Sequence, residues 1–317
     1  MKKGISLAIR VIVSLVVFGG LFWVMRKDIG DIWLTILSGN ISYMLMAGFF
    51  IFVMVVLLAM RLKVVFDGEN LFITLRESAE LTCVGFFFNN FMPTAVGGDI
   101  VKAHYASHFN KKKLKSYASV LMDRIIGMLA ILLVAAVALL IDRGRFSSPV
   151  VKPMVLILLA LGTAGVIIVT NRSVAGGLEK IFKKFKMLGL GDRLSEAYSI
   201  IHDYRNRLDV VVKSVCLSVV VQLVYCVAIY FLFLSMGKFV SIGNILLIIP
   251  VIVFISMLPS IGGLGVRESA MVAFFSVVAG KEVSFAVSLL ALAGNLLISV
   301  AGGIVYAGWS FKPGHEA

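Results

Sequence analysis

Residues 92–102 read MPTAVGGDIVK, and residues 258–267 read LPSIGGLGVR. Each stretch has a proline, a short spacer, a Gly-Gly pair and then a cation, and each interrupts an apolar region, about 77–101 and about 243–280. Proline removes a helical hydrogen bond and glycine is a weak helix former, so neither region is predicted to be one straight helix. The predicted breaks consist of Pro93, Gly97 and Gly98 in the first region and Pro259, Gly262, Gly263 and Gly265 in the second.

The composition indicates that both breaks belong to a membrane protein. The chain has 317 residues, of which 60% are hydrophobic and 15% are charged, and its mean hydropathy is +1.02. Soluble domains carry about 25% charged residues, and a single buried core could not hide this many apolar side chains. Much of the surface must therefore face lipid, which excludes an ordinary soluble fold and a disordered chain.

Outside the two breaks, six stretches are long and apolar enough to cross a membrane, which takes about 20 residues in a helix. They cover approximately residues 5–25, 41–60, 117–141, 153–170, 210–235 and 284–309. The sequence therefore predicts an all-α membrane protein with six transmembrane helices and two interrupted regions. The first span is not expected to be a cleaved signal peptide, because it has no small-residue cleavage site.

The positions of lysine and arginine predict the orientation, because short loops rich in these residues stay in the cytoplasm. Cations at residues 2–3, 61–63 and 102–115 place the N-terminus, the end of the second span and the end of the first interrupted region inside. That region is therefore expected to enter and leave on the cytoplasmic side, as a re-entrant hairpin. The basic loop 172–207 is also expected inside, so the second hairpin opens outward and the C-terminus is cytoplasmic. A location in the plasma or inner membrane follows.

The order span, span, hairpin, span occurs once in residues 1–150 and again, with opposite orientation, in residues 151–317. Inverted repeats of this kind are typical of transporters, so the chain is interpreted as one membrane domain made of two halves. Backbone freed by proline and glycine cannot face hydrocarbon, and the breaks are expected to line an enclosed or watery cavity. The alternative is that the glycines only allow close packing of helices.

The candidate substrate-binding residues are polar or charged side chains in or near the breaks. They are Asn89, Asn90, Asp99, Lys102, Asp123, Arg124, Arg267 and Glu268. A helix that restarts after Gly98, with Asp99 as its N-cap, or after Gly265, would point its first amides into the cavity, where they can hold an anion. Lys102 and Arg267 would add full positive charges beside those amides.

Asp123 and Arg124 lie inside the third predicted span, where ionised side chains are costly and do not face lipid. Adjacent residues of a helix point in different directions, so each needs a partner from elsewhere, and the first hairpin offers Asp99 and Lys102. We hypothesise that Arg124 binds a lipid phosphate, because its guanidinium donates paired hydrogen bonds. A purely structural ion pair between hairpin and span is the alternative.

Arg267 and Glu268 pose the same problem in the second hairpin. Glu268 could accept a proton, neutralise Arg267 or contact a cationic head group, and these roles stay open. The alternative is that Glu268 only stabilises the start of a helix through its charge.

The segment from Leu178 to Leu188 (LEKIFKKFKML) places apolar side chains on one helical face and lysines on the other. This pattern is typical of a helix on an anionic cytoplasmic leaflet, and the alternative is a loop helix packed on the protein itself. Orientation and this anchoring account for the excess of cations, so no nucleic-acid partner is expected. No metal or cofactor is expected either, because His104 and His108 lack a cluster of further ligands and no nucleotide motif occurs.

The residues around the breaks resemble the transmembrane region of lysylphosphatidylglycerol synthase, a flippase-like family that also occurs as stand-alone membrane proteins. The resemblance covers nearly the whole chain and is most specific at residues 89–93 (NNFMP), 97–102 (GGDIVK), 119–124 (SVLMDR) and 258–268 (LPSIGGLGVRE). In two-domain relatives this region is implicated in moving aminoacylated phospholipid between leaflets, while a soluble C-terminal domain makes that lipid. No such domain follows Trp309, so the resemblance implies transport and not aminoacyl transfer. Asp123 stands where the family pattern has glutamate.

These observations predict a transporter that moves a phospholipid or a lipid-linked head group between leaflets. The tips of the two hairpins are expected to meet near the midplane, with the cations of the candidate set engaging phosphate and its carboxylates balancing them. Two alternatives stay open. One is a membrane-embedded transferase acting on a polyprenyl- or phosphatidylglycerol-linked substrate, with Asp99 or Asp123 as its catalytic carboxylate. The other is a non-transporting partner of a lipid-modifying synthase.

Overall fold

The computed structural model describes residues 29–92, 97–110, 112–142, 150–170, 204, 207–257 and 263–310. Within these ranges the regular elements are α-helices, and no strand occurs among them. The helices are α2 (Ile29–Leu37), α3 (Ile41–Gly68), α4 (Leu75–Phe91), α5 (Gly97–Asn110), α6 (Lys113–Asp142), α7 (Val151–Thr170), α10 (Leu208–Ser235), α11 (Ile242–Ile255), α12 (Val266–Ala279) and α13 (Lys281–Ser310). The predicted all-helical class is confirmed.

Four of these helices, α3, α6, α10 and α13, are apolar and have 28 to 30 residues. At about 1.5 Å per residue each exceeds the ~30 Å thickness of the hydrocarbon core. Many of their large apolar side chains are exposed on the outside of the bundle, among them Phe49, Phe52 and Leu297. The protein is a multi-pass integral membrane protein.

Five of the predicted spans coincide with α3, α6, α7, α10 and α13 to within a few residues, except at the end of α3. Several predictions fall outside the described residues. These are the span 5–25, the segment Leu178–Leu188, and the break residues Pro93, Pro259 and Gly262.

The second span is longer than predicted. Helix α3 continues to Gly68 instead of ending near residue 60, so Arg61 is part of a helix and not of a cytoplasmic loop. Leu62, Val65 and Phe66 beyond it are buried, and their packing holds this last part of the helix in place. The placement of Arg61 in a loop is wrong, because its apolar neighbours continue the helix past the charge.

Both interrupted regions are split into two helices. In the first, α4 ends at Phe91 and α5 begins at Gly97; in the second, α11 ends at Ile255 and α12 begins at Val266. Gly263 and Gly265 have φ angles of +78° and +81°, which L-residues with side chains rarely adopt. Both regions are therefore interrupted, as the proline and glycine pattern predicts, but Gly97 and Gly98 are the first residues of α5 and not part of the break.

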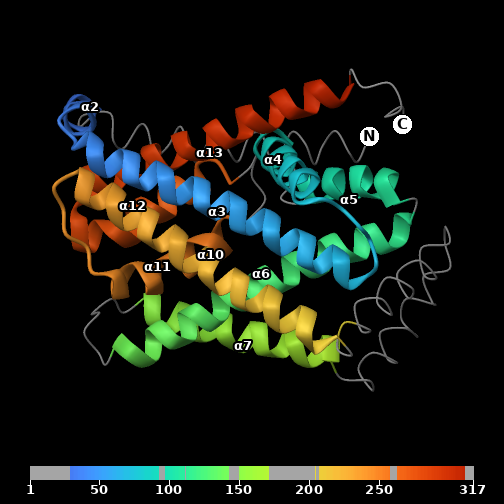
Figure 1. Ribbon diagram of the computed structural model, residues 1–317. Coiled ribbons are helices and arrows are strands. Elements are labelled where there is room, and N and C mark those ends of the chain that lie inside the picture. The colour runs from blue at the N-terminus through green and yellow to red at the C-terminus, as the bar shows by residue number, and fades with distance from the viewer. Residues whose placement is uncertain are drawn as a thin grey trace, which may run out of the picture.

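The long helices pack side by side, and α3 and α10 run antiparallel along most of their length (Figure 1). At one end the Asn40 amide donates to the Ser235 carbonyl at 2.9 Å, and at the other Gly68 faces the side chain of Val210. Helices α4 and α5 lie toward the end of the bundle where α3 finishes, whereas α11 and α12 lie toward the end where α3 begins (Figure 1). The two pairs of short helices therefore lie toward opposite ends of the bundle.

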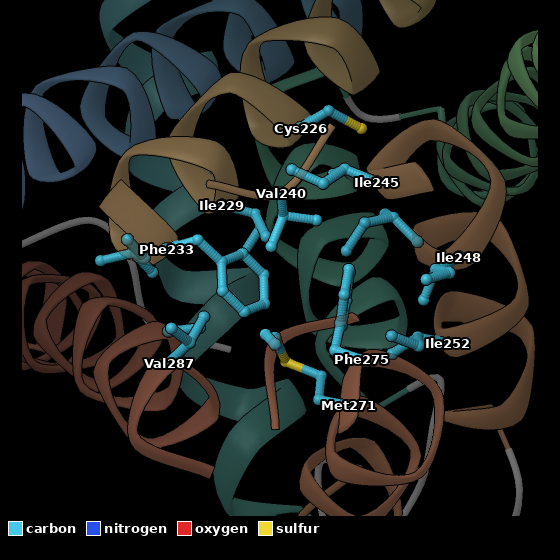
Figure 2. Packing of buried hydrophobic residues seen from close by; sticks show 14 of the residues in the cluster. Cys226, Ile229, Phe233, Val240, Ile245, Ile248, Ile252, Met271, Phe275 and Val287 are labelled. Atoms are coloured by element: carbon cyan, nitrogen blue, oxygen red, sulfur yellow. The ribbon is translucent and has the colours of Figure 1, made fainter. Parts of the chain in front are cut away.

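A large apolar core fixes the second pair of short helices. Phe233 of α10 and Phe275 of α12 meet at its centre with ring centroids 4.9 Å apart, and Met271 and Val287 surround them (Figure 2). Burying a phenylalanine contributes roughly 1.5 to 3 kcal/mol, so this core is a major source of stability. It joins α11 and α12 to α10 and α13.

Helix α13 also packs closely against α4. A Cβ added at Gly302 would lie 2.0 Å from the Cys83 carbonyl oxygen, and one at Gly303 would lie 2.9 Å from the ring of Phe87. Small residues at a helix interface allow backbones to approach in this way. The contact holds α4 against α13 just before the first break.

Candidate functional site

A buried ion pair joins α3 to α6. Arg61 donates from Nε and Nη2 to the two carboxylate oxygens of Asp123, at 2.7 and 2.8 Å, and the side chains are only 9% and 6% exposed. Its Nη1 donates to Ser218 Oγ of α10 at 3.2 Å. Gly127 of α6 provides the space, because a Cβ there would lie 2.9 Å from Arg61 Nη1. One guanidinium thus ties three long helices together.

This pair corrects the expected partner of Asp123. The first hairpin does not supply it, because both Asp123 oxygens are taken by Arg61. Two-pronged pairing inside a protein is geometrically demanding, and removing one partner of such a pair costs about 3 to 5 kcal/mol. The Arg61–Asp123 pair therefore acts first as a lock between helices.

Arg124 does find its partner in the first hairpin, as predicted. Its Nη1 donates to Asp99 Oδ2, while Lys102 Nζ pairs with Asp99 Oδ1 at 2.9 Å. Asp99 lies in the first turn of α5, which begins at Gly97, so the predicted role of Asp99 as N-cap is wrong. Its carboxylate instead joins a cation of its own helix to a cation of α6.

Close packing of α4 on α5 positions Lys102 and Asp99. A Cβ at Gly98 would lie 2.0 Å from the Gly85 carbonyl oxygen, and one at Gly85 would lie 2.7 Å from Lys102 Cε. Asn89 Oδ1 accepts a hydrogen bond from the Gly98 amide at 2.9 Å and so bridges the first break. Gly98 thus allows close packing of α4 and α5, which is the role that the sequence analysis gives as the alternative. Its amide is already bonded to Asn89.

A polar cavity of about 90 Å³ lies between α3, α4, α5 and α6. This is room for a few water molecules. Its charged lining comes from Arg61, Lys102 and Asp123, and its uncharged polar lining from Asn89 and Thr82. The cavity therefore lies next to both ion-pair groups, inside a bundle whose outer surface is apolar.

Asn90 connects the first break to the last helix. Its side-chain nitrogen donates to Ser299 Oγ of α13, which also donates to the Phe86 carbonyl at 3.3 Å. Ser299 is fully buried. Asn90 therefore holds α4 and α13 together and is not part of the cavity lining.

The charged residues of the second break pair with each other. Arg267 Nε and Nη2 donate to Glu268 Oε1 at 3.1 and 2.9 Å, and Glu268 Oε2 accepts from the Gly265 amide at 2.7 Å. Glu268 is fully buried, and Tyr225 of α10 lies in the same surroundings. Of the roles left open, the structure places Glu268 both as the counter-ion of Arg267 and as the carboxylate that caps the start of α12. The Gly265 amide is therefore occupied rather than free for an anion.

Seven of the eight predicted site residues fall into two groups, and Asn90, which bonds Ser299 of α13, belongs to neither. Asn89, Asp99, Lys102, Asp123 and Arg124 gather at the cavity or at the ion pairs beside it, whereas Arg267 and Glu268 pair with each other at the start of α12, near Tyr225 of α10. None of the residues that line this cavity comes from the described part of the second break. This cavity is therefore lined by α3 and α6 and by the two helices that flank the first break.

Two histidines of α5 stand apart from these groups. His104 and His108 bring their Nε2 atoms to 3.3 Å on an exposed face of α5. Among the described residues, no group of three or more His, Cys, Asp or Glu is placed to hold a metal ion.

The arrangement of breaks, ion pairs and apolar helices can be compared with known proteins. A family model described as the lysylphosphatidylglycerol synthase TM region matches residues 11–303, which is most of the chain. The chain belongs to this family. The match includes both breaks, the third-span motif with Asp123 and Arg124, and all the residues that line the cavity.

Two further members of the lysylphosphatidylglycerol synthase TM region family are similar over most of their length. A UPF0104 membrane protein of Methanothermobacter thermautotrophicus is 22% identical over 290 residues, which is 85% of each chain. A UPF0104 membrane protein of Pyrococcus horikoshii is 25% identical over 326 residues, which is 92% of each chain. These relatives are described as membrane proteins, in agreement with the helices of this chain.

Several site residues of this family member were missed from the sequence. In the sequence Arg61 serves as an orientation signal, although apolar residues at 62 and 64–66 behind it indicate that the helix continues. Ser218, Gly85 and Gly127 take their roles from neighbours far away in the sequence, at Arg61 and Lys102. Such spatial roles leave no signal in spacing or composition.

Proposed function

We propose that this protein moves a polar lipid between the leaflets of the membrane and that the cavity between α3, α4, α5 and α6 receives the head group. The observation that carries this proposal is a charged cavity lined by helices of a bundle whose outer faces are apolar. Charged side chains inside a membrane protein are costly and are usually retained for substrate or ion pathways. The charges here exceed what a lock between two helices needs, because Lys102, Asp99 and Arg124 form a second group beside Arg61 and Asp123.

The substrate class follows from the sum of these charges. Arg61, Lys102 and Arg124 contribute three positive charges and Asp99 and Asp123 two negative ones, which leaves +1. A net cation in a low-dielectric cavity attracts an anionic group such as a lipid phosphate. The substrate is therefore a phospholipid or a lipid-linked head group that carries phosphate, and its acyl chains stay in the bilayer.

The membrane topology that goes with this function has six spans and two opposed re-entrant hairpins, α4–α5 and α11–α12. The placement of these helix pairs toward opposite ends of the bundle supports it (Figure 1). In this topology the two halves form an inverted repeat, both termini are cytoplasmic, and the protein resides in the cell or inner membrane. The segment Leu178–Leu188 would then contact the anionic cytoplasmic leaflet, beside which a lipid-modifying synthase is a fitting partner.

Transport requires the cavity to open. Its present volume of about 90 Å³ is too small for a phosphoglycerol head group, so α4 and α5 must move against α3 or α6 to admit one. The ion pairs of Asp99 join α5 to α6 and are the contacts such a motion would break. Alternating access by movement of one half against the other is the general mechanism of inverted-repeat transporters.

A reconstituted-vesicle assay tests the proposal. Fluorescent phospholipid in the inner leaflet becomes accessible to a membrane-impermeant quencher only when it is moved outward. Wild type is expected to accelerate this exposure. Arg124→Ala and Lys102→Gln are each expected to lower the rate at least about tenfold relative to wild type. Lys238→Gln removes an exposed cation outside the bundle and is expected to match the wild-type rate. Equal rates for wild type, Arg124→Ala and protein-free vesicles would contradict the proposal, as would chemical conversion of the lipid without its movement.

A further inference from the structure

We infer that Asp99 sets the charge selectivity of the cavity, so that it accepts a phosphodiester with one negative charge in preference to a phosphomonoester with two. This inference rests on the proposed function, since it concerns the head group that the same cavity receives. It assigns to Asp99 a role in substrate choice that is separate from holding α5 against α6.

The two carboxylates beside the cavity are bound in different ways. Both oxygens of Asp123 are held by the single guanidinium of Arg61, and this pair neutralises itself. The two oxygens of Asp99 are held by different cations, Lys102 of α5 at 2.9 Å and Arg124 of α6. Asp99 is therefore one anion placed between two cations that converge on it.

A phosphate fits the same two cations. Like a carboxylate, it presents more than one oxygen to donors that lie apart, and arginine and lysine both bind it. Lys102 also lines the cavity, so an anion that enters would meet it directly. Asp99 is thus positioned to compete with an entering phosphate for Lys102 and Arg124.

The charge balance then selects among phosphates. With Asp99 ionised, the group of Asp99, Lys102 and Arg124 has a charge of +1, which a phosphodiester monoanion neutralises. A phosphomonoester carries about −1.5 to −2 at pH 7 and would leave an uncompensated negative charge. The side chains of Asp99 and Lys102 are each only 14% exposed, so solvent screens such an excess poorly.

The experiment measures which lipid stays bound to the purified full chain. The protein is placed in lipid nanodiscs that contain equal amounts of phosphatidylglycerol, phosphatidic acid and phosphatidylethanolamine, and the lipids retained after release are counted by native mass spectrometry. Wild type is expected to retain phosphatidylglycerol over phosphatidic acid. Asp99→Asn, which raises the charge of the group to +2, is expected to shift this ratio toward phosphatidic acid about tenfold.

Two further variants keep the inference testable. Lys102→Gln lowers the charge of the group to zero and is expected to lose retention of both anionic lipids relative to phosphatidylethanolamine. Glu69→Gln removes a buried carboxylate that pairs with Lys115 outside the cavity, and it is expected to keep the wild-type ratio. An unchanged ratio in Asp99→Asn, or wild-type retention of phosphatidylglycerol in Lys102→Gln, would overturn the inference.

The source of the phosphodiester is tested in the same preparation. Soluble glycerophosphoglycerol at the concentration of the lipid is expected to leave bound phosphatidylglycerol in place, and its complete displacement would overturn the assignment of a lipid ligand. This experiment measures lipid binding and not lipid movement, so its result is independent of the transport assay. Selective binding without lipid movement would contradict the proposed transport alone, whereas transport by Asp99→Asn with a wild-type lipid ratio would contradict the charge selectivity alone.

Discussion

Arg61 of α3 donates to both carboxylate oxygens of Asp123 of α6, although the two residues are 62 positions apart in the sequence. The pair lies in the wall of the cavity and is held on a third side by Ser218 of α10. Each group satisfies hydrogen bonds of the other, which offsets part of the cost of keeping two full charges inside a bundle of apolar helices. It therefore fixes one wall of the cavity, while the Asp99 group joins α5 to α6.

Breaking this pair is expected to destabilise the protein. Arg61→Ala leaves the Asp123 carboxylate buried without a cation, and we expect it to lower the free energy of unfolding by about 3 to 5 kcal/mol. Unfolding of the purified protein in detergent, followed by helical circular dichroism against denaturant, measures the loss. The double variant Arg61→Met with Asp123→Leu removes both charges and should recover most of the stability, and a single variant as stable as wild type would refute the role of the pair.

Gly127 is expected to matter because it makes room for the Arg61 guanidinium. A Cβ there would lie 2.9 Å from Nη1, and the guanidinium could yield only by lengthening its bonds to Asp123 or Ser218. We expect Gly127→Ala to cost about 1 to 3 kcal/mol of unfolding free energy. Gly48→Ala is the matched control, because a Cβ at Gly48 of α3 meets nothing within 4 Å and alanine is the better helix former. Equal stabilities of the two variants would contradict the steric argument.

The packing of α13 on α4 is testable with two glycines of one helix. Gly302→Ala places a Cβ 2.0 Å from the Cys83 carbonyl oxygen, which belongs to the backbone and cannot rotate away. We expect this variant to lose about 1 to 3 kcal/mol or to fold poorly. Gly308→Ala, where a Cβ meets nothing within 4 Å, should retain wild-type stability. Thermal aggregation of the detergent-solubilised proteins compares them, and an unaffected Gly302→Ala would show that α13 and α4 are not in close contact.

Tyr204 is expected to anchor the start of α10 and to make stability depend on alkaline pH. It is fully buried, its hydroxyl donates to the Val65 carbonyl at 2.9 Å, and it hydrogen-bonds Ser119 Oγ at 3.2 Å. Burial raises the pKa of Tyr204 above its ordinary value of about 10. The unfolded chain therefore releases the Tyr204 hydroxyl proton at lower pH than the folded protein. The contribution of Tyr204 to the free energy of unfolding is complete below about pH 10 and is lost as the pH rises further.

The variant Tyr204→Phe separates these two effects. It removes the hydroxyl and leaves the Val65 carbonyl and Ser119 without this partner, so we expect a loss of about 1 to 3 kcal/mol at neutral pH. It should also show a smaller fall in stability above about pH 10 than wild type. Denaturant unfolding at a series of pH values measures both, and a parallel pH dependence for the two proteins would argue against the buried hydroxyl as its source.

Much of the fold can be read from the sequence because membrane helices depend on local properties. Apolar length places α6, α7, α10 and α13, and the proline and glycine pattern places the two breaks. The partnership of Arg124 with the first hairpin also follows from a local argument, since neighbouring charges on a helix cannot pair with each other. These predictions need no knowledge of which helices are neighbours.

The rest of the site depends on contacts between distant segments. The sequence predicts that Asp123 pairs with the hairpin, but its partner is Arg61. Arg61 follows the long apolar run 41–60, a position that also fits the start of a cytoplasmic loop. The amides of Gly98 and Gly265 donate to the side chains of Asn89 and Glu268, and the sequence pattern does not predict either contact. Helix packing decides both points, and it is not encoded in the spacing of residues along one helix.

Photo-crosslinking tests most directly whether a lipid head group enters the cavity. A phospholipid with a photoreactive group on its head group is incorporated into vesicles with the wild-type protein, irradiated, and the modified peptides are identified by mass spectrometry. The account predicts adducts in peptides around Arg61, Thr82 and Phe86, which line the cavity, and their loss in Lys102→Gln. Adducts confined to the exposed outer faces, such as Phe49 and Leu161, would contradict it.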